Sequence, residues 1–146
     1  MRELKNKFSV YLLEDDVMYK KMLAYAFGDD AELDVSFFTT GASFLEQFRQ
    51  RPSDIVIMDY SLPDFSGQEL LKALRKHAPD TPVVIVSGSV SPATIDMLYR
   101  EGAYEFLAKD MLIRTRLNNV LNNIKSLLSL RAENAALRDR KNRKNS

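Results

Sequence analysis

Short apolar runs recur along the chain at regular intervals, and this repeat constrains the fold more than any other feature of the sequence. Four runs span residues 8–13, 33–38, 55–58 and 83–86, and a weaker fifth run spans residues 104–107. Runs of this length that are rich in Val, Ile and Phe predict β-strands. The segments between them place apolar residues at helical spacing, as Leu70, Leu71 and Leu74 do, and predict amphipathic helices. The chain is therefore expected to alternate strand and helix five times.

This alternation implies a parallel sheet, because right-handed crossovers place helices on both faces of such a sheet. Runs 55–58 and 83–86 are apolar throughout, as central strands are, whereas run 33–38 alternates apolar and polar residues, as an edge strand does. We therefore expect an α/β fold, a flavodoxin-like (βα)5 doubly wound sandwich with the parallel strand order 2-1-3-4-5.

Capping residues mark several helix starts. Ser66 and Glu69 form the pattern of a capping box, and Ser91 followed by Pro92 predicts a second N-terminus. Asp16 is expected to cap the helix that follows the first strand. Two further acids are interpreted as ordinary solvated loop residues: Asp54 and Asp64.

Composition limits the class of protein. The 146 residues suffice for one domain with its own core, and the absence of cysteine excludes a disulfide framework and thiolate metal sites. Residues 1–8 contain no long apolar stretch of the kind found in signal peptides or membrane helices, so a cytoplasmic location is expected. Residues 131–146 carry six basic and two acidic side chains and form a basic tail, for which a solvated linker is favoured over DNA binding.

Reactive side chains follow four of the predicted strands. Glu14 and Asp15 follow the first strand, Asp59 the third, Ser87 the fourth and Lys109 the fifth. The carboxyl ends of parallel strands lie at one edge of the sheet, and ligands bind there where the strand order reverses. We therefore expect these five side chains to converge on one crevice.

Three carboxylates in one crevice need a cation. Two charges about 6 Å apart repel by roughly 3 kcal/mol at an effective dielectric near 20. Clustered oxygen ligands without His or Cys suit Mg²⁺, which leaves coordination positions open to phosphate oxygens. Together with Lys109 and the Ser87 hydroxyl, such a site can position and neutralise a phosphoryl group during transfer, with Asp59 as the nucleophile.

The motifs at these strand ends occur in a characteristic order. They are LEDD at residues 13–16, MD at 58–59 followed by Pro63 and Gly67, VSG at 86–88, and FLAK at 106–109. With these motifs, residues 7 to about 125 resemble the receiver domains of bacterial two-component response regulators. The resemblance implies a sensor histidine kinase or phosphotransfer protein as partner.

The resemblance also implies a role for each site residue. Asp59 corresponds to the phosphorylated aspartate, Asp15 to a direct metal ligand, Glu14 to a ligand acting through water, and the Ser61 backbone carbonyl to a further ligand. Two residues correspond to the switch: Ser87 would move onto the phosphoryl group and Phe106 would rotate inward. The responsive surface would comprise helix four, strand five and helix five, residues 92–125, which is also a candidate homodimer face.

One position departs from the family pattern. The family lysine is commonly followed by proline in a cis peptide, but Lys109 is followed by Asp110. A cis bond before Asp would cost about 3 kcal/mol, so a trans bond is expected, with Asp110 as a candidate N-cap of the last helix.

Three other functions are alternatives to this interpretation. A phosphatase of the haloacid dehalogenase type needs a second Asp where Ser61 stands, and a flavodoxin needs a phosphate-binding loop where the acidic residues follow the first strand. Both are disfavoured. A degenerate receiver that acts as a phosphorylation-independent interaction module stays open as the alternative.

The last helix is expected to be unusually long. Good helix formers continue past residue 125, so a helix from residue 112 to 139 would extend about 42 Å. Leu127, Leu130, Asn134, Leu137 and Lys141 follow heptad spacing. We expect a receiver domain over residues 1–125 and a helical extension over 126–146. This extension is either a dimerising coiled coil that leads to an output domain beyond residue 146, or an exposed helix that frays alone.

Overall fold

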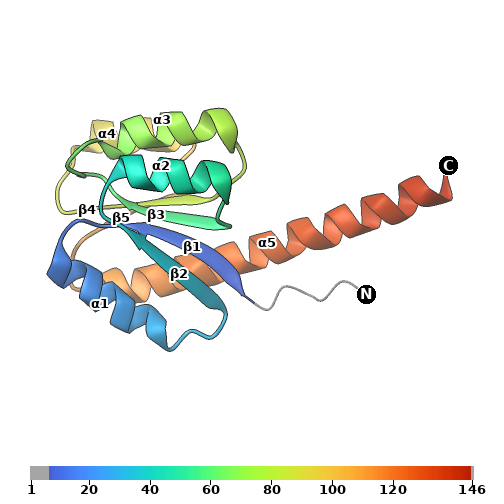
Figure 1. Cartoon of the computed structure of the whole chain (residues 1–146), viewed down its shortest axis with the longest axis horizontal. Helices are drawn as coiled ribbons and strands as arrows, with labels where there is room; N and C mark the ends of the chain where they lie inside the picture. Colours follow the sequence, from blue (N-terminus) through green and yellow to red (C-terminus); the bar gives the residue numbers. More distant parts are fainter. Residues whose placement is uncertain (1–6, 146) are drawn as a thin grey trace. The chain divides into compact units, whose positions relative to one another are not determined.

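The computed structural model describes residues 7–145 and confirms the predicted alternation of strands and helices (Figure 1). The strands are β1 (Phe8–Leu13), β2 (Leu33–Phe38), β3 (Ile55–Asp59), β4 (Val83–Ser87) and β5 (Glu105–Ala108). The helices are α1 (Val17–Gly28), α2 (Gly41–Gln50), α3 (Gly67–His77), α4 (Pro92–Arg100) and α5 (Ile113–Lys144). Residues 1–6, which carry most of the segment used to exclude a signal peptide, lie outside the described part.

The five strands form one parallel sheet in the order β2-β1-β3-β4-β5, as the sequence predicts. Strands β3 and β4 are buried at every position, whereas β2 at the edge alternates buried and exposed residues. Strand β5 begins and ends one residue later than predicted. The order therefore reverses between β1 and β3, where the candidate site was expected.

Helices α2, α3 and α4 lie on one side of the sheet and α1 lies on the other (Figure 1). Alternate residues of the inner strands enter a core cluster with buried residues of α2, α3 and α4, because successive side chains of a strand point to opposite faces. This cluster includes Leu13, Phe44, Met58, Leu70 and Leu98. Burial of these side chains against one face of the sheet helps to hold the strand ends in fixed register.

Local capping agrees with the sequence analysis. The Asp16 carboxylate accepts a hydrogen bond from the Tyr19 backbone N–H (3.0 Å), and Ser66 and Glu69 form the reciprocal capping box of α3. The Ser91 hydroxyl accepts from the Thr94 N–H (3.2 Å). These contacts satisfy backbone donors that a helix N-terminus leaves without partners.

Two acidic residues interpreted as solvated loop side chains do lie in loops, Asp64 exposed and Asp54 half-buried, but each also accepts hydrogen bonds from distant backbone. Asp64 accepts hydrogen bonds from the backbone N–H groups of Gly41 (2.8 Å) and Ala42 (2.9 Å), the first two residues of α2. Asp54 accepts from the backbone N–H of Ser9 (2.8 Å). Both partners are distant in sequence, so local patterns could not indicate them.

The chain divides into two compact units, Met1–Arg114 and Thr115–Ser146, and the division falls near the start of α5. Within α5, which has 32 residues, four side chains are buried: Ile113, Leu117, Leu121 and Ile124. Every residue over 129–145 is exposed. Over residues 7–145, none of the helices combines the length and the apolar character that a membrane span requires.

Candidate functional site

Three acidic side chains meet at the carboxyl ends of β1 and β3. Carboxylate oxygens of Glu14, Asp15 and Asp59 all lie within 4.8 Å of one another. Strand pairing brings them together, because Leu13 lies beside Met58 in the sheet and the acids are the next residues along each strand. Glu14 and Asp59 are only 2% and 8% exposed, whereas Asp15 is exposed at the mouth of the site. The predicted acidic cluster is therefore present and has one open side.

Lys109 bridges two members of this cluster. Its ammonium Nζ donates to Glu14 Oε1 (2.8 Å) and to Asp59 Oδ2 (3.0 Å). The backbone N–H of Lys109 donates to the Ser87 carbonyl (2.8 Å), which ties the loop after β5 to the end of β4. The other Asp59 oxygen, Oδ1, accepts from the Ser61 backbone N–H (3.1 Å). Both carboxylate oxygens of Asp59 are thus positioned by donors.

The electrostatics of the site favour a bound cation. Burial and, after it, the neighbouring Asp59 raise the pKa of Glu14 to about 8, although Lys109 opposes the shift. Burial lowers the pKa of Lys109, but its hydrogen bonds to Glu14 and Asp59 outweigh burial and raise it overall. One ammonium therefore does not neutralise the three acids.

The donor set fits a hard divalent cation. Within residues 7–145, Glu14 Oε2 is buried and has no hydrogen-bond partner, so one acceptor in the cluster is left unsatisfied. The cluster offers only carboxylate oxygens. Because Asp15 is exposed, an ion can enter the cluster from solvent on that side. Oxygen ligands of this kind suit Mg²⁺.

The remaining predicted residues lie around this cluster. Ser87 is buried (3% exposed) at the end of β4 beside Ala108 of β5. Ser61 follows β3 and pairs with Ser66 in an isolated bridge. Phe106 is half-buried and packs against the core cluster, so its ring already lies partly inward.

The loop after β5 has the trans bond expected before Asp110, but Asp110 does not occupy the expected N-cap position. No peptide bond in the described chain is cis, so the Lys109–Asp110 bond is trans. The Asp110 carboxylate accepts from the Leu112 backbone N–H (2.9 Å), just before α5 begins. Asp110 therefore forms a turn that leads into α5, two residues before the N-cap position.

Sequence reasoning missed one residue of the site, Tyr19. Lys109 Nζ lies 4.3 Å from the centre of the Tyr19 ring, a cation–π distance. Burial raises the pKa of the Tyr19 hydroxyl, which has no hydrogen-bond partner within the described residues. Its position in the first turn of α1, directly after the acids that follow β1, was the available signal.

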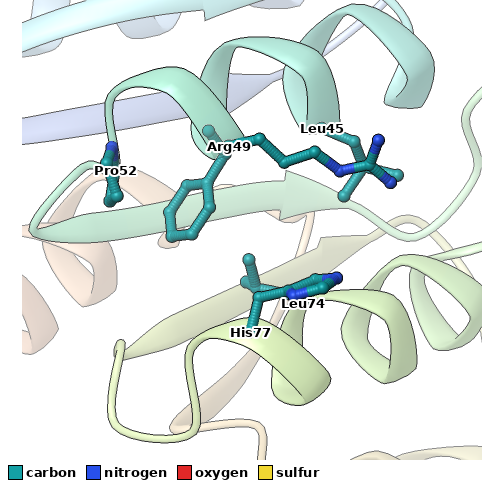
Figure 2. A pocket seen from close by; sticks show the side chains of 6 residues that line it. Leu45, Arg49, Pro52, Leu74 and His77 are labelled. Carbon is teal, nitrogen blue, oxygen red and sulfur yellow. The ribbon is translucent and has the colours of Figure 1, made fainter.

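Two cavities differ in chemistry. A small one next to the acidic cluster is lined by Glu14, Tyr19, Asp59 and Lys109 together with core side chains. A larger one of about 180 Å³ is lined by Leu45, Phe48, Arg49, Pro52, Leu74 and His77, where α2 and α3 end (Figure 2). Its lining contains no carboxylate, so size does not identify the acidic site. His77 is exposed.

Known proteins of similar sequence are regulators. The regulatory protein LuxO of Vibrio cholerae is 30% identical over 93 residues, which cover 62% of this chain and 20% of LuxO. The DNA-binding transcriptional regulator NtrC of Escherichia coli is 28% identical over 100 residues, which cover 68% of this chain and 21% of NtrC. The matched part thus spans about one fifth of the length of these curated relatives.

The fold also matches a solved structure. The signal receiver domain of a putative LuxO repressor protein from Vibrio parahaemolyticus superposes with a TM-score of 0.79 at 23% identity, over 86% of this chain and 95% of that one. The family model of the response regulator receiver domain matches residues 10–122, which include every residue of the acidic cluster and Lys109. On these grounds the chain belongs to the response regulator receiver domain family.

Proposed function

We propose that this chain accepts a phosphoryl group on Asp59 in a Mg²⁺-dependent two-component phosphorelay. The observation that carries this proposal is the bridge from Lys109 to Glu14 and Asp59 beside the exposed Asp15. A buried carboxylate with both oxygens held by donors, next to an open acidic cluster, is positioned to act as a nucleophile.

The transfer is a substitution at phosphorus. An Asp59 oxygen attacks the phosphoryl group of the donor and forms the new P–O bond of an acyl phosphate. The bond between phosphorus and the donor's leaving group breaks, and the leaving group keeps the electron pair. A phosphohistidine donor then takes up a proton on its imidazole. The chain promotes this transfer and its own dephosphorylation, and acts as a regulatory phosphoacceptor rather than a turnover enzyme.

The chain's own residues neutralise the charge of the phosphoryl group. Lys109, which already contacts Asp59, would pair with a phosphoryl oxygen, and the Ser87 hydroxyl would donate to another. Asp15, Asp59, the Ser61 carbonyl and, through water, Glu14 would hold the cation. Bound Mg²⁺ would supply further charge neutralisation at the phosphoryl oxygens.

Hydrogen bonds between β5 and α4 suggest a route for the switch. The Phe106 backbone N–H donates to the Tyr99 hydroxyl of α4 (3.0 Å), and this hydroxyl donates to the Glu105 carboxylate. Movement of Ser87 onto the phosphoryl group would leave space for the Phe106 ring to move further inward. That movement would strain the link to Tyr99 and so alter the surface formed by α4 and β5.

The partners belong to this proposal as well. The phosphodonor is a sensor histidine kinase or a phosphotransfer protein in the cytoplasm. An output domain beyond residue 146 would receive the signal. The similar protein NtrC is named a DNA-binding transcriptional regulator, which supports an output in transcription.

Intact mass spectrometry tests the proposal. Incubation with Mg²⁺ and acetyl phosphate should add one phosphoryl group to the native chain. Asp59→Asn should abolish the gain, because an amide cannot form the acyl phosphate, and EDTA should suppress it. Asp80→Asn, at a surface acid in the loop after α3, is the matched control and should be phosphorylated normally. An unchanged mass of the native protein would favour the phosphorylation-independent alternative.

A further inference from the structure

The exposed half of α5 carries an apolar stripe at heptad spacing. Leu127 and Asn134 occupy a positions, and Leu130 and Leu137 occupy d positions. The structure shows these residues within one continuous helix that runs to Lys144 (Figure 1). Leu130 and Leu137 are 56% and 59% exposed. Large apolar side chains repeated on one helix face are a common feature of surfaces that associate.

This stripe is separate from the buried face of the helix. At 100° per residue, the buried side chains Leu117, Leu121 and Ile124 share one direction, and the stripe of residues 127–137 is rotated by about 120° from it. A partner on the stripe therefore does not compete with the burial of the first half of α5. The two halves can serve different contacts at the same time.

We propose that residues 127–137 of α5 form a parallel, in-register coiled coil with a second copy of this chain. The occupant is a second copy because the stripe is self-complementary. In a parallel pair, Glu133 at position g faces Arg138 at position e of the other copy, and no g–e′ pair in this segment brings like charges together. An antiparallel pair would instead place Arg131 opposite Arg138 along the e edge.

Asn134 specifies the register. Two Asn side chains at facing a positions can hydrogen-bond to each other only when the helices are parallel and aligned, and such a pair favours two strands. Lys141 at the next a position and Lys144 at the next d position end the apolar seam. With two heptads, the dimer should be weak and should form at tens of micromolar. This inference does not depend on phosphorylation of Asp59.

Sedimentation equilibrium of the full chain tests the association. The native protein should shift from monomer to dimer mass as its concentration rises to tens of micromolar. Leu130→Lys with Leu137→Lys should raise the dissociation constant by about tenfold or more, because each charge falls in the seam. Ala132→Lys with Ala136→Lys, at the exposed f and c positions, is the matched control and should dimerise as the native chain does. A monomer mass at every concentration, or equal loss in both variants, would overturn the proposal.

Single cysteines test the orientation, because the chain contains none of its own. Under mild oxidation, Leu130→Cys should form a disulfide-linked dimer, since a parallel register places the two residues opposite each other. Ala132→Cys on the outer face should not. Glu133→Arg should weaken the dimer, and adding Arg138→Glu should restore it. Equal crosslinking of the two cysteine variants, or no rescue by the second charge change, would contradict the parallel register.

Discussion

At the scale of single residues, the site concentrates negative charge around one ammonium group. Lys109 contacts Glu14 and Asp59, while Asp15 lies at the open side. Burial is the chief cause that raises the pKa of Glu14 to about 8, so this acid favours its protonated form near neutral pH. Ionising Glu14 therefore puts the site under electrostatic strain, which a bound cation would relieve.

This strain predicts a pH-dependent stability. The Glu14 pKa is about 8 in the folded chain and near 4.5 in the unfolded chain, so the folded state holds more protons between these values. The stabilisation from protonated Glu14 is complete below the unfolded pKa and is lost as the pH rises through 8. In EDTA, Glu14→Gln should flatten the loss of unfolding free energy between pH 5 and 8 by several kcal/mol.

Urea unfolding at each pH measures this difference. Glu46→Gln, at an exposed position of α2, is the matched control and should follow the native profile. Parallel profiles for Glu14→Gln and the native protein would show that Glu14 does not titrate in this range.

At the scale of elements, side chains from distant loops complete helix ends and fix the paths of loops. The Thr40 hydroxyl accepts from the Ser43 N–H of α2, and Asp64 accepts from the two preceding N–H groups. These backbone hydrogen bonds outweigh desolvation and lower the pKa of Asp64. The loop after β3, which carries Ser61 beside Asp59, is thereby anchored to the N-terminus of α2.

Removing this anchor should destabilise the domain. Asp64→Ala leaves two N–H groups of α2 without their acceptor, so the free energy of unfolding at pH 7 should fall by about 1–2 kcal/mol. Urea denaturation measures the change. Glu46→Ala, on the exposed face of the same helix, should change stability by less than about 0.5 kcal/mol. Because the lowered pKa makes Asp64 stabilising above its unfolded pKa of about 3.8, the difference should vanish at acidic pH. A difference that persists in acid would argue against the capping role.

At the scale of the whole molecule, the family match and the buried residues of α5 end at nearly the same place. The match stops at residue 122, and Ile124 is the last buried side chain of the helix. Residues 129–145 are exposed. We therefore propose that residues 1–125 form the receiver and that residues 126–146 form an extension with a separate role.

Truncation tests this division. A chain that ends at residue 126 should keep its phosphoryl acceptance on Asp59, and its free energy of unfolding should change by less than about 1 kcal/mol, because it loses only residues with little burial. A chain that ends at residue 116 loses Leu117, Leu121 and Ile124 and should lose several kcal/mol. Acetyl phosphate labelling of both chains measures phosphoryl acceptance, and urea unfolding measures the free energy of unfolding. Equal stability of the two truncated chains would contradict the assignment.

The sequence by itself determined the architecture and most of the site. The strand order follows from the apolar character of the third and fourth runs and the alternation in the second. The meeting of Glu14, Asp15 and Asp59 then follows, because residues after adjacent parallel strands share one edge. The caps at Asp16, Ser66 and Ser91 were also predictable, since the donor lies within the next turn of the chain.

Only the tertiary structure decided the contacts between distant loops. Asp64 reaches α2 across 23 residues, and Lys109 packs on Tyr19 while bonding Glu14, 95 residues away. The raised pKa of Glu14 depends on burial that no neighbouring residue reveals. Periodicity and capping are set by near neighbours, so a sequence displays them directly. A contact across loops depends on the path of each loop and on the side-chain rotamers at its end, which are determined only when the core is packed.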